Sequence, residues 1–129
     1  MDFLPAPDIH RQLKTIVRRL KLIHIDPTRI ICFRSHGSTS RARARIWSLP
    51  RVWQLGLNLK PHYVIEVISH YFDKLSADDQ TRVIIHELMH IPQNFSGALL
   101  SHRHGRYHRI DHHTVETLFQ KYEHSLTRR

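Results

Sequence analysis

Residues 76–92, "SADDQTRVIIHELMHIP", constrain the fold of this 129-residue chain more than any other segment. Ser76 with Asp79 three positions later is close to a capping box, and the closing proline cannot continue a helix. The pattern therefore predicts a helix over residues 77–91. Its apolar run at 83–85 requires burial, so the rest of the chain must supply an apolar surface to cover this helix.

The remaining segments predict such a surface. Asp8 can cap an opening helix, and Asp111 can cap a last one. Short apolar stretches at 29–33, 41–47 and 62–69 are typical of strands, the first two as a hairpin. Residues at helical spacing mark the buried sides of the two terminal helices: Ile9, Leu13, Ile16, Val17 and Leu20 in the first, and Val115, Leu118, Phe119 and Tyr122 in the last.

We therefore predict an α+β fold, with residues 1–129 forming one domain. This domain comprises an N-terminal helix, a three-stranded antiparallel or mixed sheet, the helix at 77–91 and a C-terminal helix. Residues 48–61 read as irregular, with Trp47 and Trp53 in the core or in the wall of a cleft. Glu66, inside an apolar strand, is expected to face solvent or to form a salt bridge.

Two histidines, His86 and His90, lie one helical turn apart, and Glu87 follows the first. Thirteen residues are histidine, and an H-E-x-x-H pattern would arise by chance in roughly 4% of chains of this composition. The two imidazoles can bind one zinc ion, with Glu87 placed to take a proton from an activated water. Packed structural histidines are the competing interpretation, but they would leave buried polar groups without partners.

A catalytic zinc ion commonly has three protein ligands and an open fourth position. Candidates for the third ligand follow the motif along the chain: His102, His104 and His108 in a loop that Gly97 lets reverse, and Glu116 on the last helix. Residue spacing does not choose between them.

Several segments together resemble the putative phage metallopeptidase family, a distant relative of the SprT-like zinc peptidases. They are "SHGSTSRARARIWSLPRVWQ", "YVIEVIS", "HELMHIP", "FSGAL" and "IDHHTVETLFQKY", which cover most of the chain. The resemblance implies a zincin-like peptidase with zinc at His86 and His90 and with Glu87 as general base. It places the third ligand at His102, counted from "FSGAL", or at His104, which precedes a glycine as in SprT-like peptidases.

The formal charge of +9 favours acidic partners, including nucleic acid. The stripe formed by Arg11, Lys14, Arg18 and Lys21 is interpreted as a solvated helix face in preference to a nucleic-acid footprint. A second stripe, formed by Arg41, Arg43 and Arg45, fits an edge strand protected by charge and a substrate- or nucleic-acid-facing surface equally well.

One cysteine, Cys32, excludes an internal disulfide and fits a reducing compartment as a buried thiol. No segment resembles a signal peptide or a transmembrane span. We expect a cytoplasmic monomer without membrane contact, in the host cytoplasm if the chain is encoded by a virus.

The predicted activity is that of a zinc metalloendopeptidase acting on protein or peptide, with an edge strand holding the extended substrate. Two alternatives share the metal. One is a nucleic-acid-binding module with structural zinc, although such closed sites have four ligands and often use cysteine. The other is a zinc hydrolase directed at nucleic acid.

Overall fold

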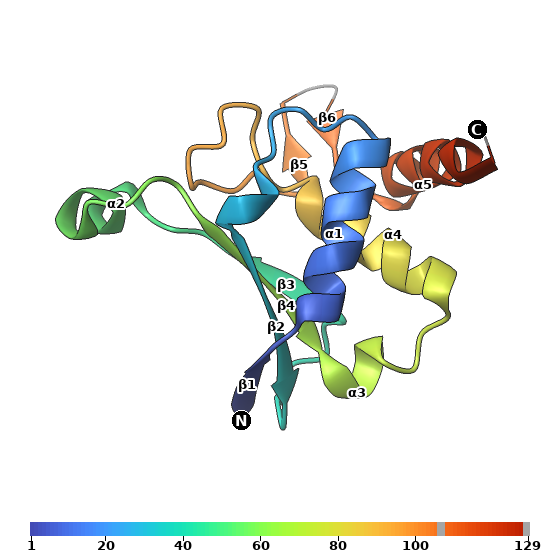
Figure 1. Ribbon diagram of the computed structural model, residues 1–129, viewed down its shortest axis with the longest axis horizontal. Coiled ribbons are helices and arrows are strands. Elements are labelled where there is room, and N and C mark those ends of the chain that lie inside the picture. The colour runs from blue at the N-terminus through green and yellow to red at the C-terminus, as the bar shows by residue number, and fades with distance from the viewer. Residues whose placement is uncertain (106–107, 128–129) are drawn as a thin grey trace.

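The computed structural model describes residues 1–105 and 108–127, without the side chains of His104, His108 and Thr127. It is an α+β fold with a four-stranded mixed sheet in the order β1-β2-β4-β3, and α1, α4 and α5 lie on one side of the sheet (Figure 1). A separate pair, β5 and β6, forms a small hairpin. In chain order the elements are β1 (Asp2–Pro5), α1 (Pro7–Arg19), a 3-10 turn (Pro27–Arg29), β2 (Ile30–His36), β3 (Ala44–Trp47), α2 (Arg51–Leu57), β4 (Tyr63–Ile68), α3 (Ser69–Phe72), α4 (Ala77–Leu88), β5 (Arg103–His104), β6 (His108–Arg109) and α5 (His112–Thr127).

The sheet has four strands where the sequence predicts three. The additional strand, β1, pairs antiparallel with β2, and the ring of Phe3 meets that of Phe33 edge-on at 6.0 Å between centroids. All four residues of β1 are exposed. The strand therefore lacks the alternation of buried and exposed side chains by which strands are recognised in a sequence.

The hairpin predicted from residues 29–33 and 41–47 is wrong. β2 and β3 do not pair with each other; β2 pairs parallel to β4, and β3 pairs antiparallel to the other side of β4. β4 is almost entirely buried, and the most apolar strand takes a central place in a sheet covered by helices. β3 begins only at Ala44, so Arg41 and Arg43 precede the strand.

Residues 48–61, predicted to be irregular, contain the helix α2, which projects away from the other helices in Figure 1. Trp53 is 57% exposed and Trp47 is 46% exposed, so neither lies in the core, which is one of the two places that the sequence predicts for them. The buried amide of Gln54 anchors α2 by donating to two loop carbonyl oxygens at 2.8 Å each. A short helix held by one polar side chain lacks the repeated apolar spacing from which helices are predicted in a sequence.

The core lies between the sheet and the helices. The predicted apolar side of α1 is buried there, together with side chains of β2, β4, α4 and α5. The prediction that Asp8 caps α1 is wrong, because the N-cap residue is Ala6. Asp8 lies in the first turn of the helix, where its carboxylate binds Arg34. The expected buried thiol of Cys32 is confirmed, and burial raises its pKa to about 12.

The last helix, α5, begins as predicted. An oxygen of the Asp111 carboxylate accepts a hydrogen bond from the amide of Thr114 at 2.9 Å, which satisfies one of the free amides at the helix start. Val115, Phe119 and Tyr122 are buried on its inner side. Among the described helices, none has both the length and the apolar content needed to cross a bilayer.

Glu66 of β4 carries a carboxylate that solvent does not reach, on the side of the sheet away from the helices. Arg45 of β3 donates to it from Nε at 2.8 Å and from Nη2 at 3.3 Å, and the indole of Trp47 donates at 3.0 Å. The salt-bridged role expected for Glu66 is therefore confirmed. Burial alone would raise the pKa of this carboxyl, but its hydrogen bonds outweigh burial and lower the pKa.

We expect Glu66→Gln to reduce the free energy of unfolding by about 2 kcal/mol at pH 7, because Arg45 loses its charged partner. The folded pKa of Glu66 lies below its ordinary value of 4.5, so its contribution is present above that pH and lost on acidification. In urea titrations the deficit of the variant should therefore shrink below pH 4.5. Glu123→Gln is the control, with an expected change below about 0.5 kcal/mol. A deficit that does not depend on pH would contradict this account.

Candidate metal centre

Helix α4 begins where the sequence predicts and ends earlier. The hydroxyl of Ser76 accepts the amide of Asp79 at 3.1 Å, which confirms the predicted cap. The helix ends at Leu88, because the amides of His90 and Ile91 bond three residues back instead of four: that of His90 reaches the carbonyl oxygen of Glu87 at 3.1 Å. His90 therefore lies in a tight turn just beyond the helix, not on its last turn as expected.

The turn brings three imidazoles together. His86 of α4, His90 of the turn and His102, which precedes β5, form a group whose candidate ligand nitrogens all lie within 4.8 Å of one another. The Nε2 atoms of His86 and His102 are 3.1 Å apart. Two nitrogens that each bind one tetrahedral zinc at its usual distance would be about 3.3 Å apart. The arrangement thus fits a small divalent ion that takes nitrogen ligands.

His90 is oriented by the backbone of the following loop. Its Nδ1 lies 2.6 Å from the carbonyl oxygen of Leu100, and the amide of Leu100 donates to the carbonyl oxygen of His90 at 2.8 Å. A carbonyl oxygen can only accept, so Nδ1 carries the proton and the neutral ring has its lone pair on Nε2. Metal-binding histidines commonly have such a second contact, which fixes both the tautomer and the ring direction.

The loop that carries Leu100 and His102 is fixed to the sheet by Tyr63. The Tyr63 hydroxyl accepts the amide of Gly97 at 2.9 Å and donates to the carbonyl oxygen of Ala98 at 2.8 Å. Gly97 has a φ of +92°, so it provides the chain reversal that the sequence predicts at this position.

A second contact holds the same loop against the segment before α2. The side-chain amide of Gln54 donates to the carbonyl oxygens of Leu49 and Ser96. The backbone amide of Leu49 donates to the carbonyl oxygen of Gly97 at 3.1 Å. The position of His102 and the contact that orients His90 therefore depend on a loop held from two sides.

Glu87 lies beside the histidines in an apolar setting. The residue is only 7% exposed, and burial raises the pKa of its carboxyl to about 7. Burial also lowers the pKa of His86 to about 4, with a further contribution from the neighbouring imidazoles. Both shifts favour the neutral forms, so near neutral pH His86 is an unprotonated nitrogen donor and Glu87 can exchange a proton.

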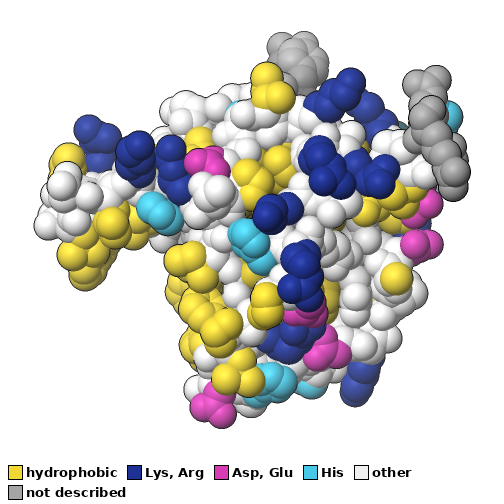
Figure 2. Space-filling view, in the orientation of Figure 1, with side chains coloured by type: hydrophobic (Ala, Val, Ile, Leu, Met, Phe, Trp, Pro, Cys, Tyr) yellow, Lys and Arg dark blue, Asp and Glu magenta, His cyan; other side chains and the backbone are white. Residues whose placement is uncertain are grey.

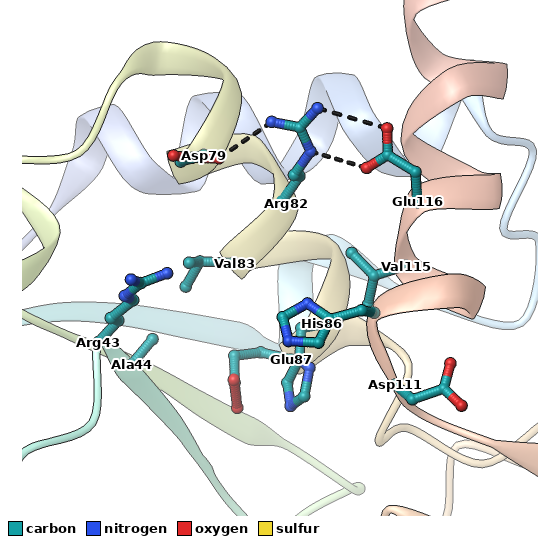
Figure 3. A pocket seen from close by; sticks show the side chains of 11 residues that line it. Arg43, Ala44, Asp79, Arg82, Val83, His86, Glu87, Asp111, Val115 and Glu116 are labelled. Carbon is teal, nitrogen blue, oxygen red and sulfur yellow. Dashed lines mark hydrogen bonds and ion pairs between the residues drawn. The ribbon is translucent and has the colours of Figure 1, made fainter.

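Glu87 and His86 face a cavity of about 410 Å³ between β3, α4 and the start of α5. Figure 3 shows Arg82 at one end of it, bridging Asp79 and Glu116, while Val83 and Val115 project from opposite helices. The lining residues are Arg43, Ala44, Asp79, Arg82, Val83, His86, Glu87, Asp111, His112, Val115 and Glu116. Both Glu87 and His86 can therefore be reached from this cavity.

The candidates for a third ligand have different surroundings. His102 belongs to the histidine group. Glu116 does not, and its carboxylate binds the Nε of Arg82 at 2.9 Å. The side chains of His104 and His108 lie outside the described residues, so the choice between His102 and His104 stays a prediction.

Several contributors to this site were not predicted from the sequence. The carbonyl of Leu100 has no side-chain signature, and Tyr63 reads as an ordinary apolar strand residue. Gln54 is a polar residue in a segment expected to be irregular. A single glutamine among apolar neighbours in the sequence does not indicate which carbonyl groups its side chain contacts.

We expect Gly97→Ala to lower the free energy of unfolding by about 2 kcal/mol and to weaken metal binding. A Cβ atom there would stand 2.6 Å from the carbonyl oxygen of Leu49 and would also press on the amide of Gln54, in a backbone conformation that strains alanine. Thermal melting and titration with zinc test both effects. Gly56→Ala is the control, because a Cβ at Gly56 meets nothing within 4 Å. Equal behaviour of the two variants would show that the loop does not depend on Gly97.

The chain matches the putative phage metallopeptidase family over residues 1–123, which includes all the elements of the main sheet, helix α4 and the three clustered histidines. No curated protein and no solved structure matches it. The family description agrees with a histidine group that could hold a metal. With nearly its full length matched, the chain belongs to the putative phage metallopeptidase family.

Proposed function

We propose that the protein is a zinc-dependent endopeptidase of zincin-like architecture. The observation that carries the proposal is the convergence of three imidazoles next to a buried carboxylate, at a cavity open to substrate. Family membership agrees with this activity. Three nitrogen ligands are typical of a catalytic zinc ion, which keeps a position open for water or substrate.

His86, His90 and His102 would hold the ion. Bound zinc would polarise the scissile carbonyl group and lower the pKa of the attacking water. Glu87 would accept the proton of that water and then deliver it to the nitrogen of the leaving amine. Its raised pKa, about 7, suits a group that must take up and release one proton in each cycle near neutral pH.

Strand β3 would bind the substrate backbone. It is the last strand on its side of the four-stranded sheet, and Ala44 at its start lines the cavity next to Glu87. An extended peptide can add to such an edge by main-chain hydrogen bonds, which do not require a particular sequence. The ion pair between Arg45 and Glu66 would keep this edge strand in register with β4.

The alternatives from the sequence explain the site less well. A purely structural zinc does not require a buried glutamate or a cavity beside its ligands. A hydrolase acting on nucleic acid would bring phosphates into a cavity whose four carboxylates outnumber its two guanidinium groups: Asp79, Glu87, Asp111 and Glu116 against Arg43 and Arg82. These carboxylates would repel a phosphodiester more than a neutral peptide bond.

Glu87→Gln tests the assigned proton transfer. We expect the variant to fold and to bind zinc as the wild type does, while peptide hydrolysis falls by about 10²–10⁴-fold. Zinc content measured by mass spectrometry and cleavage of an unfolded protein substrate give the two readouts. Glu123→Gln, which removes a carboxylate of α5 outside the cavity, should retain full activity. Undiminished hydrolysis by Glu87→Gln would exclude Glu87 as the base.

Zinc stoichiometry tests the assigned third ligand. We expect His102→Ala to reduce the bound zinc from about one ion per chain to a small fraction, because two imidazoles alone hold zinc weakly. His104→Ala and Glu116→Ala should retain the ion. If His104→Ala lost zinc while His102→Ala kept it, the third ligand would be His104. A wild-type chain that binds no zinc would refute the proposed activity itself.

A further inference from the structure

We propose that the outward side of α1 binds the phosphate backbone of nucleic acid. Arg11, Lys14 and Arg18 are exposed and lie three and four residues apart, on one side of the helix. Figure 2 shows Lys and Arg side chains gathered over α1, with no comparable run of acidic side chains among them. This inference concerns a surface outside the metal centre and does not depend on the peptidase proposal.

These cations are not neutralised by the fold. Some of the other arginines have acidic partners; Arg34, for example, binds Asp8 and Asp73. Arg11, Lys14 and Arg18 form no ion pair with any residue that the structure describes. Asp8 is the only acidic residue of α1, and Arg34 already engages it. The charge of this helix side is therefore directed at solvent.

The positive surface continues past the end of α1. A broad, shallow groove of about 1010 Å³ lies between that end and α5, and Lys21 and Lys121 both line it. Its remaining lining residues are Arg19, Leu20, Gln120, Glu123, His124 and Ser125. We call Arg11, Lys14, Arg18, Lys21 and Lys121 together the basic face. One carboxylate, that of Glu123, lies in the groove.

The dimensions and composition of the basic face indicate a nucleic-acid backbone. Arg11 and Arg18 are about 10 Å apart along the helix axis, a length over which duplex DNA presents roughly six phosphate charges. A membrane surface fits less well, because the apolar residues of α1 are buried in the core and none of them can enter lipid. A protein partner would need an apolar centre, which the exposed side of the helix lacks.

The basic face and the cavity of the metal centre use different surfaces. The cavity is lined from β3, α4 and the start of α5, and no residue of α1 contributes to it. A nucleic acid on the basic face would therefore leave the cavity open. The sequence alone favours a solvated helix face, but the missing ion pairs and the adjoining basic groove support a binding surface.

The test is binding of the full chain to a fluorescently labelled 20-base-pair DNA duplex, measured by anisotropy at several salt concentrations. Each phosphate contact adds about 0.9 to the slope of log affinity against log salt. In the triple variant Arg11→Gln, Lys14→Gln, Arg18→Gln the magnitude of this slope should be smaller by roughly 2–3. The variant should also bind at least about tenfold more weakly than the wild type at low salt. A single-stranded probe should show the same loss, because the shared element is the phosphate backbone.

The matched control removes the same charge from other exposed positions: Arg51→Gln, Lys60→Gln and Lys74→Gln. It should keep most of the wild-type slope, and circular dichroism should show both variants folded. Equal weakening in the two triple variants would mean that only net charge matters and would overturn the proposal. So would a wild type that does not bind DNA at low salt, or one that binds anionic vesicles and not DNA.

Discussion

The structure depends on the burial of α4 against the sheet. Ile84, Ile85 and Leu88 are almost completely buried, which fixes the rotation of this helix about its axis. Because successive residues of a helix are turned by about 100°, this rotation directs His86 toward the cavity and leaves Glu87 at the boundary between core and cavity. The same burial raises the pKa of Glu87, so packing sets both the position and the protonation of the proposed base.

The features predictable from the sequence are those whose signals are local. The caps at Ser76 and Asp111 and the buried sides of the terminal helices are each encoded within a few neighbouring residues, and the structure confirms them. The pairing of strands is not local. β4 separates β2 from β3 because its own burial is most favourable at the centre, a competition between segments that no single stretch of sequence displays.

The candidate metal centre also combines features with local sequence signals and features without them. The spacing of His86 and His90 predicts their proximity, although the turn after Leu88, and not one regular helix, produces it. The contacts that orient the site are backbone groups, above all the carbonyl of Leu100, and these have no residue identity in a sequence. The approach of His102 depends on a loop held by Tyr63, a residue whose sequence context indicates only a strand.

The charges of the chain are distributed unequally, and this difference bears on both proposals. In the cavity Arg82 is shared by Asp79 and Glu116, so its cation is cancelled where a substrate would lie. On α1 the cations have no such partners among the described residues, and the one carboxylate of this helix, that of Asp8, is already bound by Arg34. A field of this kind would favour the proposed contact of a polyanion with the basic face, whereas carboxylates outnumber arginines on the walls of the cavity. If both proposals hold, this distribution of charge would favour peptide in the cavity and nucleic acid on the basic face.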